Sequence, residues 1–377
     1  MSQAKERQVS RENGPQPGHG PLQGLKVIEF AGLGPGPFAC MLLADMGADV
    51  ITIDRAGKKL GDRTNIAGRG RTVVMADLKD PIVKDDVLRL IDEADVLIEG
   101  YRPGVMERLG FGPTTLEQRN PRLIYGRMTG WGQQGPLSHT AGHDIGYIAL
   151  SGALHAIGTV GGPPSVPLNL VGDYGGGSLF LVTGILAALH ERERSGRGQI
   201  VDAAITDGVV SLMTHFVASE MRGQFKEERG TNLLDGGAPY YAVYETADGK
   251  HVAVGAIEPT FFELLCELAG VKESLRSAQN DRVRWPELKR EFTQIFMSKT
   301  RDEWQALLEN TDACFAPVLS ISEAASHPHH VARVSFVEID GVSQPAPAPR
   351  FSRTASCANR PAPKEPVALV NAIERWR

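Results

Sequence analysis

Cysteine and long apolar runs are both scarce in this chain of 377 residues. The 4 cysteines include no C-x-x-C pair, which argues against a disulfide framework and against a zinc cluster. We therefore expect a cytoplasmic protein with reduced thiols. The longest apolar run, residues 179–189, is too short to span a bilayer, so we predict a buried helix there and no membrane partner.

An excess of positive charge is also missing. The chain carries 40 Lys and Arg against 45 Asp and Glu, a net charge of -5, which argues against nucleic acid as its main partner. Residues 1–20 have no apolar run and are rich in Gly and Pro, so they are predicted to be a disordered tail instead of a signal peptide. The histidines around His327 lack a second set of ligands at metal-binding spacing, and no metal site is predicted.

The first half of the chain does contain an alternation of strands and helices. Strands are predicted at 25–30, 49–53, 95–98 and 122–128, with helices at 37–46 and 82–93. This alternation predicts an α/β domain with a mainly parallel sheet that helices cover on both faces. Ligands of such domains bind beyond the carboxyl ends of the strands, where Arg55, Tyr101 and Arg102 are expected.

A different pattern begins near residue 240. Strands at 240–246 and 251–256, joined by an Ala-Asp-Gly-Lys turn, predict a β-hairpin. Amphipathic helices are expected at 260–269, 286–298 and 302–309. At about 150 residues per domain, the chain length agrees with a larger α/β domain and a smaller α+β domain.

The loop after the first predicted strand is close to a dinucleotide-binding fingerprint but departs from it. Glycines stand at Gly32, Gly34 and Gly36, whereas the G-x-G-x-x-G pattern requires glycine where this chain has Pro37. Pro37 is predicted to be the first residue of the helix, where its missing N–H loses no hydrogen bond.

Cations follow the second predicted strand, where an NAD site would need a carboxylate. Arg55 comes directly after Asp54. More cations follow along the chain: Arg63, Arg69, Arg71 and Lys79. Guanidinium groups bind phosphate through paired N–H donors, so this cluster is either a phosphate site or a solvated basic face.

Two polar side chains stand in glycine-rich settings that suit a cleft. His143 follows Gly142, and Asp173 precedes the glycines at 175–177. A histidine and a carboxylate can act as general acid and base. A helix is predicted to start at His143 or Asp144, and the positive end of its dipole disfavours imidazolium, which favours a neutral histidine base. The alternatives are a capping or core histidine and an aspartate that caps a helix.

Several short motifs together resemble the family III CoA-transferase superfamily, and within it a branch of acyl-CoA racemases. The resemblance covers about residues 22–351, and its most specific pieces include the following: Gly34-Pro35-Gly36-Pro37-Phe38, Gly100-Tyr101-Arg102-Pro103-Gly104, Gly142-His143-Asp144, residues 169–177 and Asp235-Gly236-Gly237-Ala238-Pro239. It implies an isomerase that interconverts the two configurations of 2-methylacyl-CoA thioesters. CoA would enter as part of the substrate, with no further cofactor. Gly146 departs from the pattern, because relatives commonly carry Asn there.

The resemblance also assigns roles to single residues. It implies that His143 and Asp173 are the acid and base of the reaction, and that Glu258 lies close to the histidine. Contacts with CoA are implied for a larger set: Arg55, Ala76, Asp77, Leu78, Lys79, Gly100, Tyr101, Arg102, Arg108, Gly142, Asp144, Ile145, Gly146 and Tyr147.

The fold that the resemblance implies is an interlocked homodimer of two-domain subunits. A Rossmann-like large domain would span residues 21–204 and be completed by residues 347–377. A small domain would span residues 243–326, with linkers at 205–242 and 327–346. The active site would lie between the large domain of one subunit and the small domain of the other.

Three other functions compete with the racemase. A CoA-transferase would use Asp173 as a nucleophile that forms covalent intermediates, and it has no need of the second proton carrier that His143 offers. An NAD-dependent oxidoreductase is disfavoured by Pro37 and Arg55. A CoA-binding protein without activity would keep the arginines but would not require His143.

Overall fold

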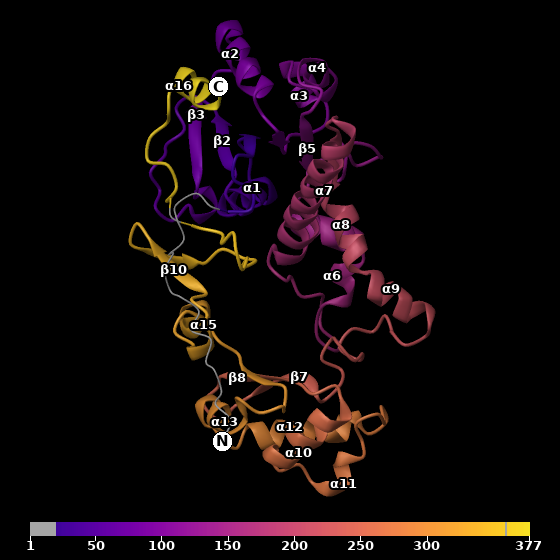
Figure 1. The fold of residues 1–377 in the computed structure, drawn as a ribbon. Coiled ribbons are helices and arrows are strands. Elements are labelled where there is room, and N and C mark those ends of the chain that lie inside the picture. Colours follow the sequence, from indigo (N-terminus) through magenta and orange to yellow (C-terminus); the bar gives the residue numbers. More distant parts are fainter. Residues whose placement is uncertain (1–19, 359) are drawn as a thin grey trace, which may run out of the picture. The chain divides into compact units, whose positions relative to one another are not determined.

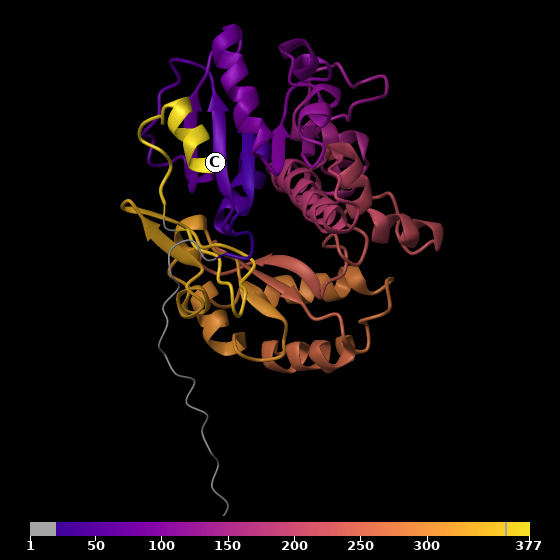
Figure 2. The ribbon, with the colours of Figure 1, turned by 45° about the horizontal axis from the view of Figure 1, so that its top comes forward.

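The computed structural model describes residues 20–358 and 360–377, so the predicted tail lies outside the described residues except for Gly20. The chain forms two compact units, whose segments can be followed by colour (Figure 1; Figure 2). Unit 1 comprises Met1–Asp144, Gly172–Gly208 and Val334–Arg377, and unit 2 comprises Ile145–Val171 and Val209–Arg333. The segment Ile145–Val171, which we grouped with the large domain from the sequence, thus clusters with unit 2.

Unit 1 is built on a 6-stranded sheet with the strand order β3-β2-β1-β4-β5-β6. Its strands are β1 (Lys26–Phe30), β2 (Asp49–Asp54), β3 (Arg71–Met75), β4 (Val96–Glu99), β5 (Ile124–Thr129) and β6 (Ile200–Ala204). Every neighbouring pair runs parallel, so the predicted parallel α/β fold is confirmed. The inner strands are buried along most of their length because both faces of a parallel sheet are covered, and charged residues such as Glu29 and Arg127 are buried among their apolar residues.

Helices cover this sheet. α2 (Pro81–Asp92) and α16 (Leu369–Trp376) pack side by side (Figure 1; Figure 2). Ile28 and Phe30 of β1 share a core with Leu90 of α2 and Ile373 of α16. α1 (Pro35–Asp45) and α7 (Leu179–Ser195) pack against each other and against strands of the same sheet. Successive strand residues point to opposite faces, which supplies an apolar layer for the helices on each side.

Shorter elements complete unit 1. They are η1 (Ile66–Gly68), α3 (Val105–Leu109), α4 (Pro113–Arg119) and the hairpin of β10 (Phe336–Ile339) and β11 (Val342–Pro345). Three further helices run across the boundary between the units: α5 (Asp144–Leu150), η2 (Leu170–Ser178) and α8 (Ile205–Leu212). η2 is a π-helix that continues directly into α7.

The helical stretch Leu170–Ser195, formed by η2 and α7, is long and apolar enough by length and composition alone to cross a membrane. It is longer than the apolar run at 179–189 because η2 joins it. α7 packs on β5, β6 and α1, as the core helix of an α/β fold does. The α7 part of the stretch is therefore a helix packed on the sheet of unit 1.

The start of α1 differs from the sequence prediction. The helix begins at Pro35, with Gly34 as its N-cap at φ 65°, and the prediction that Pro37 is the first helical residue is wrong. Pro37 is tolerated in the first turn because the N–H groups there have no partner within the helix.

Two of the cations after β2 hold the fold together and do not form a phosphate site. Arg69 is 2% exposed, and its guanidinium donates to both carboxylate oxygens of Asp45, at 3.0 and 2.6 Å. Arg71 opens β3, a strand that the sequence did not predict, and bonds Glu29 of β1 at 2.6 Å. Loss of either partner would leave a charge buried and unpaired, which is strongly destabilising.

Unit 2 contains a 3-stranded antiparallel sheet of β7 (Tyr241–Glu245), β8 (His251–Gly255) and β9 (Phe315–Pro317). Its helices are α6 (Ala153–Ala156), α9 (Thr214–Met221), α10 (Pro259–Ala269), α11 (Glu273–Arg276), α12 (Trp285–Phe296), α13 (Arg301–Leu308), α14 (Ile321–Ala324) and α15 (Pro328–Ala332). The core is aromatic, because Phe296 contacts both Tyr244 and Trp304 with ring centroids 5.1 Å apart. The predicted hairpin and the helices after it are present.

Candidate active site

Three loops at the carboxyl edge of the sheet carry many of the residues implied for CoA. Arg55 follows β2, residues 76–79 follow β3 and residues 100–102 follow β4. β2 and β4 flank β1 in the parallel sheet and β3 lies next to β2, so the three loops open on the same edge. The Ala76 N–H donates to the Asp54 carbonyl at 2.8 Å and joins the first two loops. This edge is where α/β folds bind their ligands.

The cations on this edge are turned to solvent. Arg55, Lys79, Arg102 and Arg108 all have exposed side chains. Beside them, Asp77 is exposed, Leu78 is half-buried and Ala76 is buried. Exposed guanidinium and ammonium groups suit the phosphates of CoA, and this arrangement supports the implied contacts without testing them.

A buried network holds the third loop. Glu99, the last residue of β4, is 1% exposed and accepts the Tyr101 N–H at 2.8 Å and Arg127 Nε at 3.0 Å. Arg127 of β5 also donates to Glu107 of α3 at 2.9 Å. The loop after β4 and the helix after it are therefore tied to the sheet by one set of ionic hydrogen bonds.

Tyr101 points back to the loop after β1. Its hydroxyl donates to the Ala31 carbonyl at 3.3 Å. Burial raises the pKa of the Tyr101 phenol, and the nearby carboxylate of Asp54 raises it further. The hydroxyl therefore remains a neutral donor at physiological pH.

His143 and Asp144 are neighbours in the chain but have different surroundings. The side chain of His143 is exposed directly before α5, which excludes the core-histidine alternative. Asp144 begins α5 and is 8% exposed. Its Oδ2 accepts the backbone N–H of Asp173 at 2.6 Å. The loop that carries His143 and the helix that carries Asp173 are thus joined within unit 1.

Asp173 lies inside η2, so it is not a helix cap. Ser178 Oγ lies 3.1 Å from the Asp173 carbonyl oxygen and 2.7 Å from that of Pro35. A Cβ placed on Gly34 would stand 3.1 Å from Asp173 Oδ2, so the carboxylate borders the loop after β1. π-Helical turns are rare and are frequent at functional sites, which agrees with the role predicted for this carboxylate.

The glycines after Asp173 allow close packing of η2. A Cβ on Gly177 would lie 3.1 Å from Ile205 Cγ1 of α8 and 3.3 Å from Pro35 Cβ of α1. A Cβ on Gly208 of α8 would lie 1.9 Å from the Gly176 carbonyl oxygen. In the same turn, Tyr174 stacks on Phe38 of α1 with ring centroids 4.3 Å apart. The glycine-rich setting of Asp173 therefore serves the packing of the helix that presents it.

Gly142, also implied as a CoA contact, is half-buried in unit 1 beside His143, whereas Glu258, Ile145, Gly146 and Tyr147 belong to unit 2. Glu258 is exposed at the N-cap of α10, and its side chain makes no capping hydrogen bond. In α5, Ile145 is exposed, Gly146 is half-buried and Tyr147 is buried. Their contacts with CoA, and the approach of Glu258 to His143, stay predictions.

Asp144 and Ser178 have supporting roles that the sequence does not reveal. Asp144 is implied as a CoA contact, yet its carboxylate is turned inward to η2. Ser178 bonds two carbonyl groups at the end of the glycine run. A small hydroxyl after a glycine run is the only local signal, and it does not reveal the partners because these depend on the tertiary fold.

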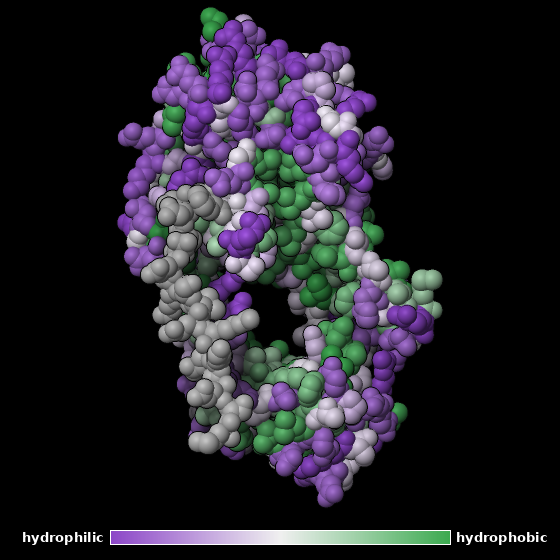
Figure 3. All heavy atoms as spheres, in the orientation of Figure 1, coloured by the Kyte–Doolittle hydropathy of each residue, from purple (hydrophilic) through white to green (hydrophobic). Residues whose placement is uncertain are grey.

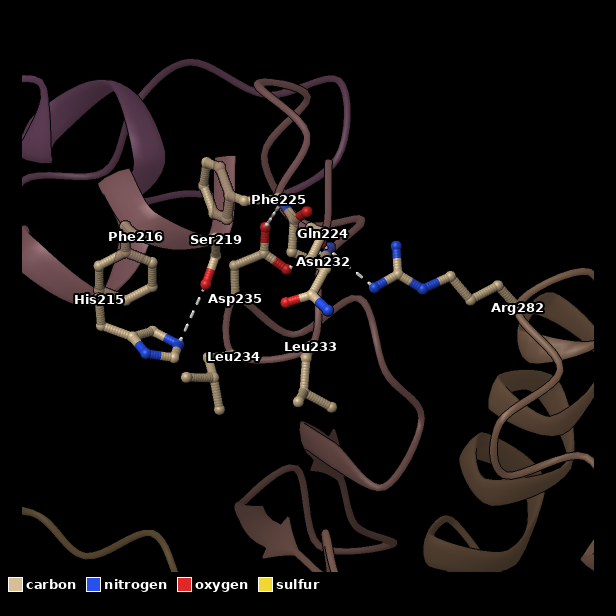
Figure 4. Close-up of a pocket in the computed structure, with 10 residues that line it drawn as sticks. All are labelled: His215, Phe216, Ser219, Gln224, Phe225, Asn232, Leu233, Leu234, Asp235 and Arg282. Carbon is tan, nitrogen blue, oxygen red and sulfur yellow. Dashed lines mark hydrogen bonds between the residues drawn. The ribbon is translucent and has the colours of Figure 1, made fainter. Parts of the chain in front are cut away.

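A separate pocket of about 340 Å³ lies within unit 2 (Figure 4). His215 and Ser219 of α9, Arg282 and the loop around Asp235 line it. The Asp235 carboxylate accepts N–H groups of its own loop, among them that of Asn232 at 2.8 Å. This carboxylate therefore braces the loop, and the pocket contains none of the residues implied for catalysis or CoA.

The histidine motif near the end of unit 2 has a structural role. His327 caps α15 by accepting the His329 N–H, and its Nε2 lies 2.8 Å from Glu309 Oε1. In the part of the chain that the structure describes, no group of three or more His, Cys, Asp or Glu side chains could hold a metal ion.

Comparison with known proteins places this arrangement in a family. A family model described as CoA-transferase family III matches residues 22–366. The α-methylacyl-CoA racemase of Mus musculus is 45% identical over 358 residues, which cover 94% of this chain and 92% of that protein. The acetyl-CoA:oxalate CoA-transferase of Acetobacter aceti is 31% identical and covers 89% of this chain and 90% of its own length.

A solved structure extends the similarity to the fold. A CAIB/BAIF family protein from Brucella suis superposes with a TM-score of 0.80 at 24% identity, over 95% of this chain and 100% of that chain. The family match, the relatives and the shared fold agree, and this chain belongs to CoA-transferase family III.

Proposed function

We propose that this protein is an isomerase that racemises 2-methylacyl-CoA thioesters, in the metabolism of branched-chain fatty acids or sterol side chains. The observation that carries the proposal is the link between an exposed histidine, His143, and the carboxylate residue Asp173, through the hydrogen bond that Asp144 accepts. The 45% identity to an α-methylacyl-CoA racemase supports the same activity.

Racemisation requires proton carriers on opposite faces of the α-carbon. In the proposed mechanism, one of His143 and Asp173 removes the α-proton, and the other delivers a proton to the opposite face of the enolate. Fixed N–H donors near Asp144 would stabilise the charge that develops on the thioester oxygen. Glu258 is expected beside the histidine, and CoA enters only as part of the substrate.

The CoA moiety is proposed to bind across the carboxyl edge of the sheet in unit 1. Arg55, Lys79, Arg102 and Arg108 supply exposed cations there for its phosphates. The backbone of residues 76–79 and 100–102 borders the same edge, which agrees with the contacts that the family resemblance implies.

The main rival is a CoA-transferase in which Asp173 attacks the thioester carbonyl and forms a covalent intermediate. That mechanism gives His143 no role on the opposite face of the substrate. The transferase from Acetobacter aceti is also less similar to this chain, at 31% identity, than the racemase is.

The test is hydrogen exchange at the α-carbon. One enantiomer of a 2-methylacyl-CoA is incubated with the protein in D₂O, without an acceptor acid, and the α-position is followed by NMR. Deuterium incorporation with loss of configuration supports the racemase. Absence of exchange, with CoA transferred once an acid is added, would instead establish the transferase.

Single substitutions identify the two proton carriers. His143→Ala and Asp173→Ala are each expected to lower kcat for racemisation by about 100-fold or more, because each removes a general acid and base. His139→Ala is the matched control, since His139 is an exposed histidine in the same loop. A variant at position 143 or 173 that kept the full rate would remove that residue from the mechanism.

We also propose that the protein acts as a cytoplasmic homodimer without membrane or nucleic-acid partners. In unit 1, Leu179 and Phe180 of α7 are 50% and 37% exposed, and apolar side chains gather on the surface over this helix (Figure 3). In unit 2, Val217 and Met221 of α9 are exposed as well. A second copy that covers such patches agrees with the interlocked dimer that the family implies.

A further inference from the structure

We infer that Asp144 is a positioning residue whose carboxylate holds the His143 loop against the helix that carries Asp173. This inference rests on the proposed racemase function, because it concerns the distance between the two proton carriers. It assigns Asp144 a role inside the protein, in addition to any contact that its backbone makes with CoA.

The hydrogen bond sets an upper limit on the separation of the two carriers. Asp144 Oδ2 lies 2.6 Å from the Asp173 nitrogen, and His143 is the residue next to Asp144. Covalent geometry then keeps the Cα atoms of His143 and Asp173 within about 12 Å of each other. Two side chains at that separation can address one carbon atom from opposite sides.

Gly172 is the second observation, and it shows how tightly the carboxylate packs at the same contact. An ideal Cβ on Gly172 would stand 2.3 Å from Asp144 Oδ2 and 2.6 Å from Asp144 Cγ. The carboxylate therefore occupies the place that a side chain at position 172 would fill. The contact requires glycine on one side and a short side chain with an acceptor oxygen on the other.

The opposite end of the contact is already fixed. Ser178 Oγ donates to the Asp173 carbonyl at 3.1 Å and to the Pro35 carbonyl at 2.7 Å, which ties Asp173 to the start of α1. The segment before α5 has no regular helix or strand over residues 139–143. Loss of the Asp144 hydrogen bond should therefore release the His143 loop, while Asp173 stays in position.

Because only the His143 loop should be released, the expected effect differs from that of a general folding defect. In Asp144→Ala, kcat for racemisation should fall by about 100-fold, the size expected when a catalytic group is displaced by about 1 Å. The KM should change little, because the exposed cations of the sheet edge lie on other loops. Exchange of the α-proton should fall less for the enantiomer that Asp173 deprotonates than for the other.

Asp144→Asn is the conservative variant, since its amide oxygen can still accept the Asp173 N–H. It should recover most of the kcat that Asp144→Ala loses. Gly172→Ala approaches the same contact from the other side and should lower kcat with Asp144 intact. Thermal unfolding and binding of CoA to each variant report whether the fold is retained.

The outcomes separate this inference from the proposed function. A wild-type protein without α-proton exchange overturns the racemase itself. If the wild type exchanges the proton but Asp144→Ala keeps the wild-type kcat, the positioning role alone is overturned. Equal losses for both enantiomers in Asp144→Ala and Asp144→Asn, together with a lower melting temperature, would also overturn it in favour of a purely structural carboxylate.

Discussion

At the scale of single residues, Glu99 is subject to opposing influences on its charge. Burial raises the pKa of its carboxyl group to about 7, although the Tyr101 N–H and Arg127 both act to lower it. Its ordinary value is 4.5. The group that anchors the loop after β4 therefore titrates near neutral pH in the folded protein.

We expect Glu99 to make unit 1 less stable as the pH rises from about 4.5 to about 7. The folded-state pKa is the higher one, so the unfolded chain releases this proton first and the stability contribution is lost through that window. The loss amounts to about 3 kcal/mol in free energy of unfolding. Glu99→Gln should abolish this part of the pH dependence in urea unfolding at pH 5 and pH 8.

Glu117→Gln is the control for that measurement. Glu117 lies on the surface and pairs with Arg197 at 3.4 Å, where solvent screens the charge. Its substitution should leave the pH dependence of the wild type in place. A Glu99 variant with the wild-type pH dependence would show that this carboxylate is not the group that titrates.

The two proposed proton carriers could be identified from the sequence, whereas the side chains that hold them in place could not. His143 and Asp173 stand in glycine-rich motifs that match a known family. The Asp144 side chain points inward because it bonds Asp173, which is 29 residues away. The Arg69 side chain is buried because it pairs with Asp45, which is 24 residues away. No local propensity or periodicity encodes such pairings, so Arg69 and Arg71 were read as part of an exposed cluster.

At the scale of elements, α16 covers part of the sheet, and the sequence does not predict this helix. Trp376 is 3% exposed in the core that α16 shares with α2, and its Nε1 donates to Asp49 Oδ2 at 2.7 Å. Arg375 also donates to Asp49, at 2.9 Å. The helix therefore fastens the C-terminal segment to the start of β2.

Removal of the Trp376 side chain should weaken unit 1. Trp376→Ala should lower the free energy of unfolding by about 3–5 kcal/mol, because it leaves a cavity in the core and removes one of the two donors to the Asp49 carboxylate. Urea unfolding followed by circular dichroism measures the change. Val370→Ala on the same helix is the control, since Val370 is 57% exposed and should change stability by less than about 0.5 kcal/mol. Equal effects of the two substitutions would contradict the role of Trp376.

The sequence predicts the long helices with a clear apolar periodicity, but it does not predict the irregular ones. α2, α10 and α12 begin and end within a few residues of their predicted limits. The π-helical turn η2 was predicted as ordinary helix from Gly175 onward. η2 packs closely on α8 where Gly176 meets Gly208, and the local sequence does not specify such a tertiary contact.

At the scale of the whole molecule, the division into a larger α/β part and a smaller α+β part could be read from the change of pattern near residue 240. The assignment of Ile145–Val171 to unit 2 could not, because it depends on contacts between distant segments. The interlocked dimer rests on the family resemblance, since one chain carries no pattern for it.

The dimer is a prediction that sedimentation can test. At micromolar concentration the protein should have twice the monomer mass of 40.7 kDa. Leu179→Glu should shift the equilibrium toward monomer, because it places a charge on the exposed apolar surface of α7. Glu193→Lys, which exchanges one charge for another on the same helix, is the control. A wild-type protein that sediments as a monomer would contradict the proposal.

Because unit 1 is made of three separate chain segments, it cannot be completed until the last segment has been synthesised. Arg69 is made early, yet two of its acceptors, the side chain of Gln344 and the carbonyl of Pro345, emerge from the ribosome only after all of unit 2. The strip of the sheet face that α16 covers beside α2 and β3 stays exposed until still later. A nascent chain therefore carries an exposed apolar strip throughout most of translation, and such a strip is a surface that a chaperone can bind.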